Sequence, residues 1–464
     1  MARTAKKKVL TLEEKLEQAL VPVEEQPYPV PENWVWTSIN FVFDVTSSKR
    51  VHKEEWRPQG VPFYRTRELV VLSEYGVVNN ELFITEELYN EFFYKYGVPR
   101  IGDILISGVG TIGIPYVVQT NDRFYFKDGN IIWFKNKRVC NPKYIFYLYK
   151  SLFMKNQIKA FSSGTTVDTY TIVNANRTLV PLPPYSEQKR IVDKIEKLVS
   201  ELDQAKELAQ SVLASFKERR VSMIYRGVNG ELTKSWRSNR NIKRSDWNSL
   251  ALHDICDRLQ YGTSKKSEAT GRTIVIRMGN LQLGEIVWDN LAYTNDGEDE
   301  KKYMLETGDV LFNRTNSPEL VGKTSIYRGE YPAIFAGYLV RLCYKKEVVC
   351  GEYLNYVMNS DFAKDYCQTV KSDGVNQSNI SAKKIGMFVV PIPSLHEQQE
   401  IVRILDSFFE KEQRAKELCE EVLDKIEHTK KSILARAFRG ELGTNDPNEE
   451  SSLELLKQIL SEQD

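Results

Sequence analysis

The sequence has few of the side chains that most often hold metals or form cross-links. Its 464 residues include six cysteines and four histidines. The cysteines form no CxxC pair and no regular spacing, which argues against a zinc motif or a disulfide framework. The histidines are scattered (His52, His253, His396 and His428), so we expect them to pack or lie on the surface, with no metal site. Free thiols are typical of the cytoplasm, where we expect the protein to act.

Long hydrophobic runs are also missing. A membrane-spanning helix needs roughly 20 apolar residues in succession, and no such run occurs. The basic and then amphipathic start, Met1–Leu20, lacks the apolar core of a signal peptide. We therefore expect no membrane partner. The formal net charge of +1 argues against a uniformly basic surface, although residues 33–184 have an excess of basic over acidic side chains, which suits a polyanionic partner.

Catalytic signatures are absent as well. No GxxxxGK[ST] phosphate-binding loop occurs. The run Pro181–Pro184 lacks the amide of the Asn-Pro-Pro-aromatic motif of amino-methyltransferases. The glycine-rich run Gly108–Gly113 is not a GxGxxG followed by a helix, because Pro115 and β-branched residues are close by. We interpret it as a turn, either at a binding surface or purely structural. We assign no catalytic residue and no metal ligand.

What the sequence does contain is a long internal repeat. Pro181–Leu232 recurs without a gap as Pro391–Leu442. A gapless repeat of this length indicates a duplicated structural unit. Each copy starts with Pro-x-Pro, which ends a strand, and then places apolar residues at steps of three and four. This period predicts one long helix per copy, with a narrow apolar seam for a partner helix. Ser186 is predicted to cap the first turn of the helix in the first copy.

We expect the two long helices to pair with each other, because they share one register. The alternative is two unrelated amphipathic helices, each packed on its own domain. The predicted seam consists of large apolar side chains at heptad positions. They are Ile191, Ile195, Leu198, Leu202, Val212, Phe216, Ile401, Leu405, Phe408, Val422, Ile426 and Ile433.

One globular unit precedes each long helix, and matching residues recur in the two units in the same order. Gly102–Leu105 matches Gly308–Leu311. Further matches pair Trp36 with Trp247, Arg65 with Arg277, and Leu69 with Leu281. Single helices are predicted at Pro142–Lys155 and Gly351–Thr369, and short helices at Leu10–Leu20 and Leu453–Leu460, which either pack or fray.

The predicted fold class is α+β. Two mixed α/β domains are joined by two long helices that form an antiparallel coiled coil. Parallel helices would force both domains to one end, whereas antiparallel helices place them at opposite ends, related by a pseudo-two-fold axis. The segments are an N-terminal extension (1–32), a first domain (33–184), a central helical repeat (185–238), a second domain (239–394), a C-terminal helical repeat (395–443) and a tail (444–464).

This arrangement resembles the specificity subunit of Type I restriction–modification enzymes. The resemblance covers nearly all of the chain and rests on the order of domains and helices. It also rests on the runs PLPPYSEQKRIV and PIPSLHEQQEIV and on the Gly-Glu-Leu that ends each repeat. It implies that each domain is a target-recognition domain that reads one half of a bipartite site in double-stranded DNA. The paired helices would set the spacer between the halves.

The resemblance also implies partners. Two modification (methyltransferase) subunits would dock on the helices, and restriction subunits would join that core. The chain itself would be non-catalytic and would hold no cofactor. S-adenosylmethionine, ATP and Mg²⁺ would be bound by the partner subunits.

Base recognition needs donors and acceptors on loops that reach a groove. In the first domain the candidates are Arg65, Thr66, Arg67, Ser107, Thr111, Ser163, Thr165 and Thr166, and Arg123 is a candidate to hold a DNA phosphate. In the second domain they are Lys265, Arg277, Asn280, Asn313, Arg314, Thr315, Asn316, Lys323, Asn376 and Gln377. The run Asn313–Ser317 is the strongest candidate for base contacts; the alternative is an ordinary Asn-rich turn.

Two other classes of function stay open at this point. One is an enzyme with an unrecognised nuclease or transferase site. The other is a coiled-coil adaptor that binds protein or RNA through its two domains. Methylation or cleavage by the pure chain would favour the first class, and failure to bind any duplex would favour the second.

Overall fold

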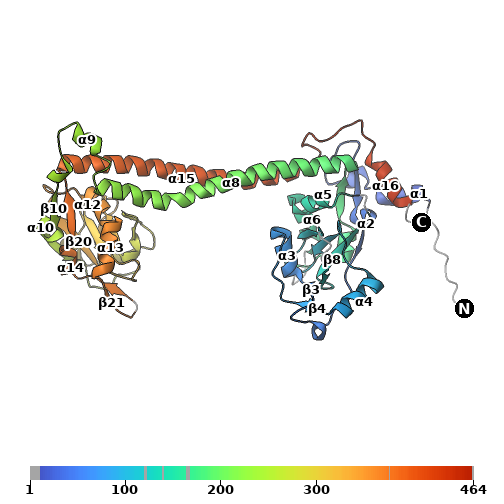
Figure 1. The fold of residues 1–464 in the computed structure, drawn as a ribbon, viewed down its shortest axis with the longest axis horizontal. Coiled ribbons are helices and arrows are strands. Elements are labelled where there is room, and N and C mark those ends of the chain that lie inside the picture. Colours follow the sequence, from blue (N-terminus) through green and yellow to red (C-terminus); the bar gives the residue numbers. More distant parts are fainter. Residues whose placement is uncertain (1–10, 120–122, 138–139, 163–167, 376, 462–464) are drawn as a thin grey trace. The chain divides into compact units, whose positions relative to one another are not determined.

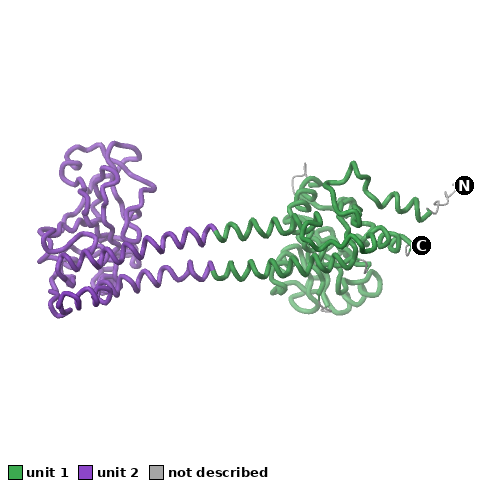
Figure 2. Tube along the Cα trace, turned by 90° about the horizontal axis from the view of Figure 1, so that it is seen from above, with its two compact units in different colours: residues 1–208, 422–464 green, residues 209–421 purple. Residues whose placement is uncertain are grey.

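The two long helices organise the structure, which is a computed structural model describing residues 11–461 except 120–122, 138–139, 163–167 and 376. They are α8 (Tyr185–Val228) and α15 (Leu395–Ala437) (Figure 1). The chain divides into two compact units, residues 1–208 with 422–464 and residues 209–421 (Figure 2). Each unit contains one globular domain, here called the first or second head, and a segment of both long helices.

The first head is built on a four-stranded antiparallel sheet in the order β2-β8-β5-β6. A three-stranded sheet in the order β4-β3-β7 has β3 and β7 parallel. In addition, β1 pairs with β9, the strand that leads into α8. The strands are β1 Val35–Ser38, β2 Phe43–Thr46, β3 Val61–Tyr64, β4 Phe83–Ile84, β5 Ile104–Ser107, β6 Pro115–Val117, β7 Tyr125–Phe126, β8 Ile131–Asn136 and β9 Leu179–Leu182.

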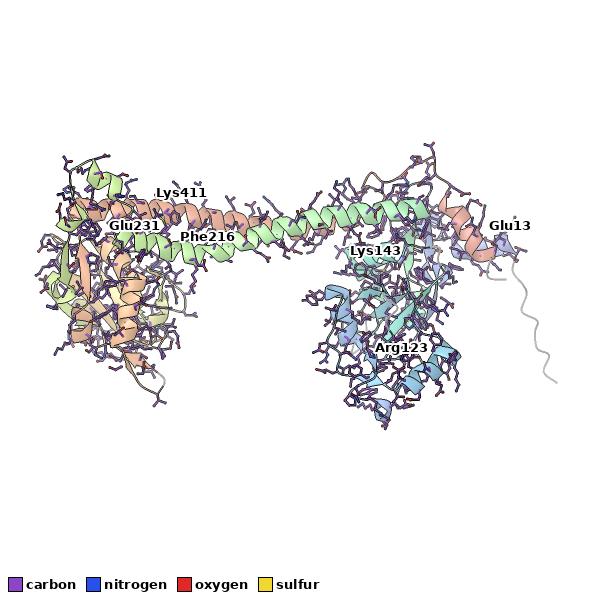
Figure 3. All side chains as sticks on the ribbon, viewed as in Figure 1. Glu13, Arg123, Lys143, Phe216, Glu231 and Lys411 are labelled. Atoms are coloured by element: carbon purple, nitrogen blue, oxygen red, sulfur yellow. The ribbon has the colours of Figure 1, made fainter. Side chains whose placement is uncertain are left out.

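Helices cover both faces of the four-stranded sheet. They are α2 Ile39–Val42, α3 Thr66–Tyr75, α5 Pro142–Lys150, α6 Leu152–Ser162 and α7 Ile172–Asn176. Helix α4 (Glu86–Tyr96) packs instead on the three-stranded sheet. Ile104 and Ile106 of β5 pack with α5 and the start of α8, while Leu105 packs with α3. Because successive side chains of a strand point to opposite faces, Ile104, Leu105 and Ile106 of β5 are all buried. On the outer side of α5, Lys143 lies below α8 (Figure 3) and its Nζ donates to Glu196 of α8 at 2.7 Å.

The second head repeats this topology. Its sheets have the orders β11-β20-β16-β18, β15-β12-β19 and β10-β23, with β12 and β19 parallel. The strands are β10 Asn248–Ala251, β11 Cys256–Tyr261, β12 Thr273–Ile276, β15 Ala292–Thr294, β16 Val310–Asn313, β18 Thr324–Ile326, β19 Ala333–Phe335, β20 Leu339–Tyr344 and β23 Val389–Ile392. Its helices are α9 Lys234–Ser238, α10 Leu252–Ile255, α11 Gly297–Tyr303, α12 Gly351–Met358, α13 Asp361–Val370 and α14 Ala382–Gly386. The two heads therefore share one α+β fold.

The second head also contains two small sheets. One pairs β13 (Leu281–Gln282) with β14 (Glu285–Ile286). The other has the order β17-β22-β21, with β17 Thr315–Asn316, β21 Ser372–Asp373 and β22 Ser378–Asn379. Both small sheets lie in segments that connect the larger strands and helices.

Each head has two helices where the sequence predicts one. The predicted helix Pro142–Lys155 is broken between α5 and α6, and the predicted helix Gly351–Thr369 between α12 and α13. Ser151 accepts a hydrogen bond from the backbone N–H of Met154, and Ser360 from that of Ala363. The serine hydroxyl satisfies an amide at the start of the next helix, so the chain turns at this point.

The two long helices run antiparallel within each unit. In the first unit, Lys206 of α8 pairs with Glu427 of α15 at 2.8 Å, and Asp203 pairs with Lys430. In the second unit, Arg219 of α8 pairs with Glu412 of α15 at 3.1 Å. A later residue of α8 faces an earlier residue of α15, so the direction is opposite, as predicted.

Small residues allow the helices to approach closely. A Cβ added at Gly227 of α8 would lie 3.2 Å from both Ile401 and Leu405 of α15. The matching position of the second repeat is Ala437, which is completely buried. At both places a larger side chain would force the helices apart.

The seam differs from the predicted one near the middle of each helix. Val212 and Val422 are 37% and 42% exposed, whereas the next residues, Leu213 and Leu423, are half-buried. The prediction is wrong at these two valines. An α-helix has 3.6 residues per turn, so a pattern of 3.5 drifts around it and brings the following leucine to the interface.

The other predicted seam residues are less accessible. Most of those that are almost completely buried belong to clusters shared with a head: Ile191, Ile195, Ile401, Leu405 and Ile433. Ile426 is 4% exposed and lies outside these clusters. Others are half-buried: Leu198, Leu202, Phe216 and Phe408. The tightest packing is thus found where the helices also contact a head.

The start of α8 is fixed by a buried carboxylate. Glu187 is completely buried and accepts hydrogen bonds from Trp34 Nε1 at 2.7 Å and Asn445 Nδ2 at 2.9 Å. Ser186, predicted to cap this helix, instead donates to Glu449 at 2.8 Å. The carboxylate thus joins the beginning of the first head to the segment that follows α15.

The start of α15 has the same arrangement with other donors. Glu397 is buried and accepts from Trp247 Nε1 at 2.9 Å, from Arg237 at 2.6 Å and from Thr233 at 2.8 Å. Strand pairing places Trp36 opposite Pro181 but Ser249 opposite Pro391. The counterpart of Trp247 is therefore Trp34, and the predicted match with Trp36 is wrong.

The glutamine that follows each buried glutamate also holds the chain. Gln188 accepts from the backbone N–H of Asn141 at 2.8 Å and donates to the Pro183 carbonyl at 3.0 Å. Gln398 accepts from Cys350 and donates to the Pro393 carbonyl, each at 2.9 Å. The Glu-Gln of each repeat is therefore structural.

The terminal helices pack together in the first unit. They are α1 (Leu12–Ala19) and α16 (Ser452–Ser461). Their shared cluster includes Ala19, Leu456 and Leu460, all nearly inaccessible to solvent. The two short helices are thus packed rather than frayed.

We expect Ile195→Asp to destabilise the first unit by about 3 kcal/mol or more, because it buries an unpaired charge. Val422→Asp is the matched control on the partner helix, with an expected loss below about 1 kcal/mol, since this position is exposed. Urea unfolding followed by circular dichroism measures both. Equal losses would contradict the observed seam.

Candidate nucleic-acid interface

The polar loops predicted for the second head lie on adjoining segments. Strand β17 pairs with β22, which places Thr315 opposite Asn379. Arg314 donates to Asn379 Oδ1, and Asn379 Nδ2 donates to Thr315 Oγ1, both at 2.9 Å. The Arg314 guanidinium also lies over the ring of Tyr261, 4.9 Å from its centre. A cation, amides and an exposed aromatic ring thus meet on one surface.

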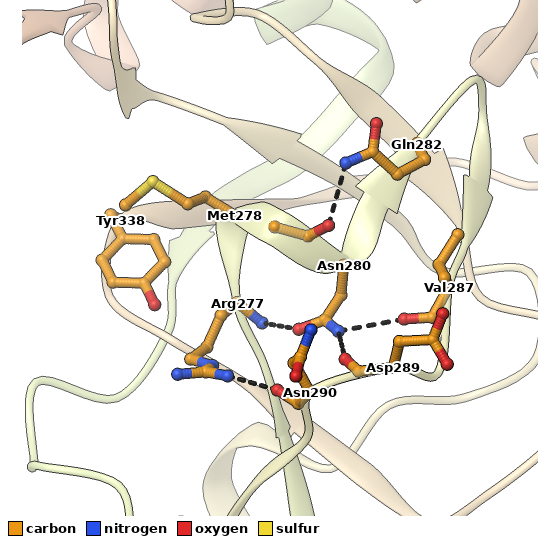
Figure 4. Close-up of a pocket in the computed structure, with 9 residues that line it drawn as sticks. Arg277, Met278, Asn280, Gln282, Val287, Asp289, Asn290 and Tyr338 are labelled. Carbon is orange, nitrogen blue, oxygen red and sulfur yellow. Dashed lines mark hydrogen bonds between the residues drawn. The ribbon is translucent and has the colours of Figure 1, made fainter. Parts of the chain in front are cut away.

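This surface continues into a cavity of about 520 Å³ (Figure 4). Tyr338 lines the cavity, and its carbonyl accepts from the backbone N–H of Arg314 at 3.1 Å. Arg277 and Gln282 line it as well, and Lys323 Nζ donates to Gln282 Oε1 at 3.0 Å. The structure thus brings together Arg277, Arg314 and Lys323, which are far apart in sequence.

Two predicted base contacts in this head are buried and serve the fold. Asn280 is 4% exposed, and its amide binds three backbone groups. Asn313 is completely buried, and its Oδ1 accepts from the N–H of Thr315 at 3.3 Å. Both side chains brace their loops, and Asn280 contributes to the wall of the cavity, so a direct contact of either with a base stays a prediction.

The remaining predicted residues of this head are more exposed. Asn316 is half-buried at the end of β17, and Gln377 is exposed beside β22. Lys265 forms ion pairs with Asp296 and Asp299, so its charge is already compensated. Asn376 lies outside the described residues.

In the first head, a single carbonyl connects two of the predicted loops. Asn130 O accepts from Thr66 Oγ1 at 3.4 Å and from the N–H of Gly108 at 2.8 Å. The loop after β5 also bridges to the segment before α7, through Val109 and Thr169. The loops that carry Arg65 and Thr111 therefore adjoin, as their counterparts do in the second head. Ser163, Thr165 and Thr166 lie outside the described residues.

Two predicted contacts of the first head are already engaged. Ser107 is completely buried, and its hydroxyl donates to Thr111 O and accepts from the N–H of Ile114, so it braces the loop. Arg123, labelled in Figure 3, forms an ion pair with Glu86 and lies over the ring of Tyr89. Its charge is thus compensated by Glu86, and its contact with a DNA phosphate stays a prediction.

The arginines that begin α3 are neutralised by acidic neighbours. Glu68, 1% exposed, accepts from Arg65 Nη2 at 2.7 Å and from Arg67 Nε at 3.1 Å. Arg67 Nη2 also donates to Glu81 at 2.7 Å. Burial opposes ionisation of Glu68, but the hydrogen bonds from Arg65 outweigh it and lower the pKa of Glu68. This corner of the first head therefore has little net positive charge.

Neither metal chemistry nor thiol chemistry is indicated. Within the described ranges, no three His, Cys, Asp or Glu side chains are placed to hold a metal ion. Burial raises the pKa of Cys256 and of Cys367 to about 12, so both thiols stay protonated at neutral pH. Among the same residues, no helix combines the length and apolar character needed to cross a membrane.

The lowered pKa of Glu68 predicts a pH dependence. Ionised Glu68 stabilises the folded state at pH values above 4.5, the ordinary pKa of a glutamate. This stabilisation is lost as the pH falls through the lower pKa that Glu68 has in the folded state. Between about pH 5 and pH 3, Glu68→Gln should therefore lose less unfolding free energy than the wild type. Urea titrations across this window measure the difference. Glu81→Gln is the exposed control, and an equally shallow pH profile for it would contradict the role of Glu68.

Comparison with known proteins agrees with the duplicated fold. The family model for the Type I restriction modification DNA specificity domain matches residues 31–212 and 244–423. The EcoKI specificity subunit of Escherichia coli (strain K12) is 28% identical over 304 residues, 64% of this chain and 65% of that relative. The StySPI specificity subunit of Salmonella potsdam is 26% identical over 311 residues, 66% of each chain. The matches thus span just under two thirds of these relatives.

A solved structure supports the fold. The HsdS subunit from Thermoanaerobacter tengcongensis is similar with a TM-score of 0.63 and 19% identity, covering 90% of this chain and 100% of that one. The two matches of the family model cover both heads and most of both long helices. The chain therefore belongs to the Type I restriction–modification DNA specificity family, whose domain it contains twice.

Proposed function

We propose that this chain is the DNA-recognition subunit of a Type I restriction–modification complex. In this proposal each head reads one half of a bipartite site in double-stranded DNA. The observation that carries it is the duplication: two heads with the same strand orders have different side chains on their loops. A shared scaffold with different loops is what two different short targets require.

The chemistry of the loops supports DNA as the target. Arginine, asparagine and threonine side chains next to an aromatic ring offer the donors and acceptors that base edges recognise. In the second head, Arg277 and Arg314 supply cations that bind no carboxylate among the described residues. Named relatives in the family are specificity subunits of Type I restriction enzymes.

In this proposal the chain does no chemistry itself. Two modification subunits dock on the long helices and bind S-adenosylmethionine, and restriction subunits use ATP and Mg²⁺. The repeat supports two identical docking sites, because Val212 and Val422 occupy equivalent positions and both are exposed. The apolar surface at each valine is suited to a partner helix.

We expect the isolated chain to transfer no methyl group to DNA, even with S-adenosylmethionine present. Adding a separate modification subunit should produce adenine methylation at one bipartite sequence. Methylation is measured on plasmid DNA with a labelled methyl donor and by mapping modified bases in cells that carry both genes. Stoichiometric methylation by the pure chain would contradict the proposal.

The paired helices should also act as a ruler. Removing one heptad from each, Leu198–Gln204 and Phe408–Arg414, keeps the seam pattern and shortens each helix by about 10 Å. Because B-DNA rises about 3.4 Å per base pair, the preferred spacer should shrink by about three base pairs while both half-sites stay unchanged.

The same deletion rotates one half-site by roughly 100° about the duplex, at 10–10.5 base pairs per turn. A large loss of affinity is therefore the other outcome that a rigid ruler predicts. A folded variant that binds as tightly as before and keeps the original spacer would show that the helices do not set the distance.

A further inference from the structure

Arg65 and Arg277 occupy the same place in the two heads. Each follows the central strand of a three-stranded sheet, β3 or β12, whose neighbour β7 or β19 runs parallel. The backbone N–H of each donates to the side chain three residues later, at 2.9 Å in both heads. That residue is Glu68 in the first head and Asn280 in the second. The local backbone is thus the same, but the chemistry differs.

In the first head, the capping carboxylate also binds the guanidinium. Glu68 accepts from Arg65 Nε at 3.0 Å and from Arg65 Nη2 at 2.7 Å. This bidentate pair occupies the Nε and Nη2 donors of Arg65, which a ligand would otherwise bind. It also compensates the positive charge of the guanidinium. Arg65 therefore has little left to offer to DNA.

In the second head, the capping side chain is neutral and is used elsewhere. Asn280 Nδ2 donates to the carbonyls of Val287 and Asp289, both at 2.9 Å. The Arg277 side chain donates to the carbonyl of Asn290, and its buried Nε has no hydrogen-bond partner. No carboxylate among the described residues forms an ion pair with it. The protein thus leaves this guanidinium charged and only partly satisfied.

The unpaired guanidinium opens onto the cavity of about 520 Å³. Figure 4 shows Arg277 between Tyr338 and Asn290, with the Asp289 carboxylate directed away from it. The side chain of Gln282 lies on the far side of Asn280. The Arg277 guanidinium, flanked by the Tyr338 ring and by side-chain amides, can bind a planar polar group that carries hydrogen-bond acceptors on one edge.

We propose that Arg277 reads a guanine in the half-site bound by the second head, and that Asn280 and Asn290 position it. Guanine offers O6 and N7 in the major groove, which match two N–H donors of one guanidinium. The first head lacks this contact, because Glu68 occupies Arg65. The inference rests on the proposed function, since it assigns one base of a bipartite site.

The test uses the full chain in complex with its modification subunit. Modified adenines are first mapped to define the wild-type site. Arg277→Gln and Arg277→Lys are then compared with the wild type for methylation of duplexes that differ at single positions. Arg272→Gln is the matched control, because Arg272 is an exposed arginine of the same head that pairs with Glu300.

Both Arg277 variants should lose selectivity at one G·C pair by about 5- to 150-fold, the range for a good bidentate contact. The change should be confined to one half of the site, and Arg272→Gln should leave it unaltered. Asn280→Glu recreates the pair found in the first head, so it should relax the same position although Arg277 is still present. Melting by circular dichroism verifies that each variant is folded.

Three results would overturn the inference. One is a wild-type half-site without a G·C pair at any position that the second head selects. Another is a folded Arg277→Gln complex with unchanged selectivity. The third is a loss of affinity that is equal for all sequences, restored by Arg277→Lys and accompanied by a smaller salt dependence, which indicates a phosphate contact. If the wild-type complex modifies no bipartite site at all, the proposed function fails instead.

Discussion

The buried carboxylates of Glu187 and Glu397 are the constraint on which the rest of the structure depends. An ionised carboxylate removed from water is strongly unfavourable unless donors surround it. In each unit those donors come from segments that are far apart in sequence: the tryptophan that precedes the first strand pair of the head, and the residues that follow the other long helix. Head and helices must therefore assemble together.

The two carboxylates are satisfied in different ways. In the first unit the closing donors are neutral, with Asn445 foremost, whereas in the second unit Arg237 supplies a full positive charge. The tryptophan donor is the same in both. The duplicated scaffold has thus kept the acceptor and one donor, while the segment that closes each site has diverged.

Much of the architecture follows from the sequence because it depends on periodic patterns. The apolar steps along the repeat predict the long helices, and the shared landmarks predict two similar heads. The exposure of Val212 and Val422 does not follow, since the heptad pattern ignores how a 3.6-residue helix drifts. The helix breaks at Ser151 and Ser360 could not be predicted from the sequence, because serine occurs within helices as well as at their caps.

The candidate interface was harder to predict. Asn and Ser on loops are equally suited to binding bases and to bracing a turn, and only hydrogen-bond geometry distinguishes the two. Asn280, Asn313 and Ser107 proved to be braces, whereas Arg314 and Thr315 are half-buried and remain partly exposed. Arg65 and Arg277 differ because the residue three positions later is Glu68 in one head and Asn280 in the other. The sequence does not reveal this, because the structure is needed to show that the two loops are equivalent.

The contact between tryptophan and glutamate also bears on how such a chain can change its target. The unit that is duplicated in sequence is a head followed by a helix, but the unit that packs is a head with segments of both helices. A foreign head acquired by recombination would therefore meet helices that it did not evolve with. It would have to bring an indole N–H at the right place before its first strand and a strand that pairs with the one leading into the helix. It would also need apolar side chains and a backbone N–H that fit the start of that helix. Heads that share these features can differ everywhere else. The recognised sequence can therefore diverge quickly while the long helices stay the same.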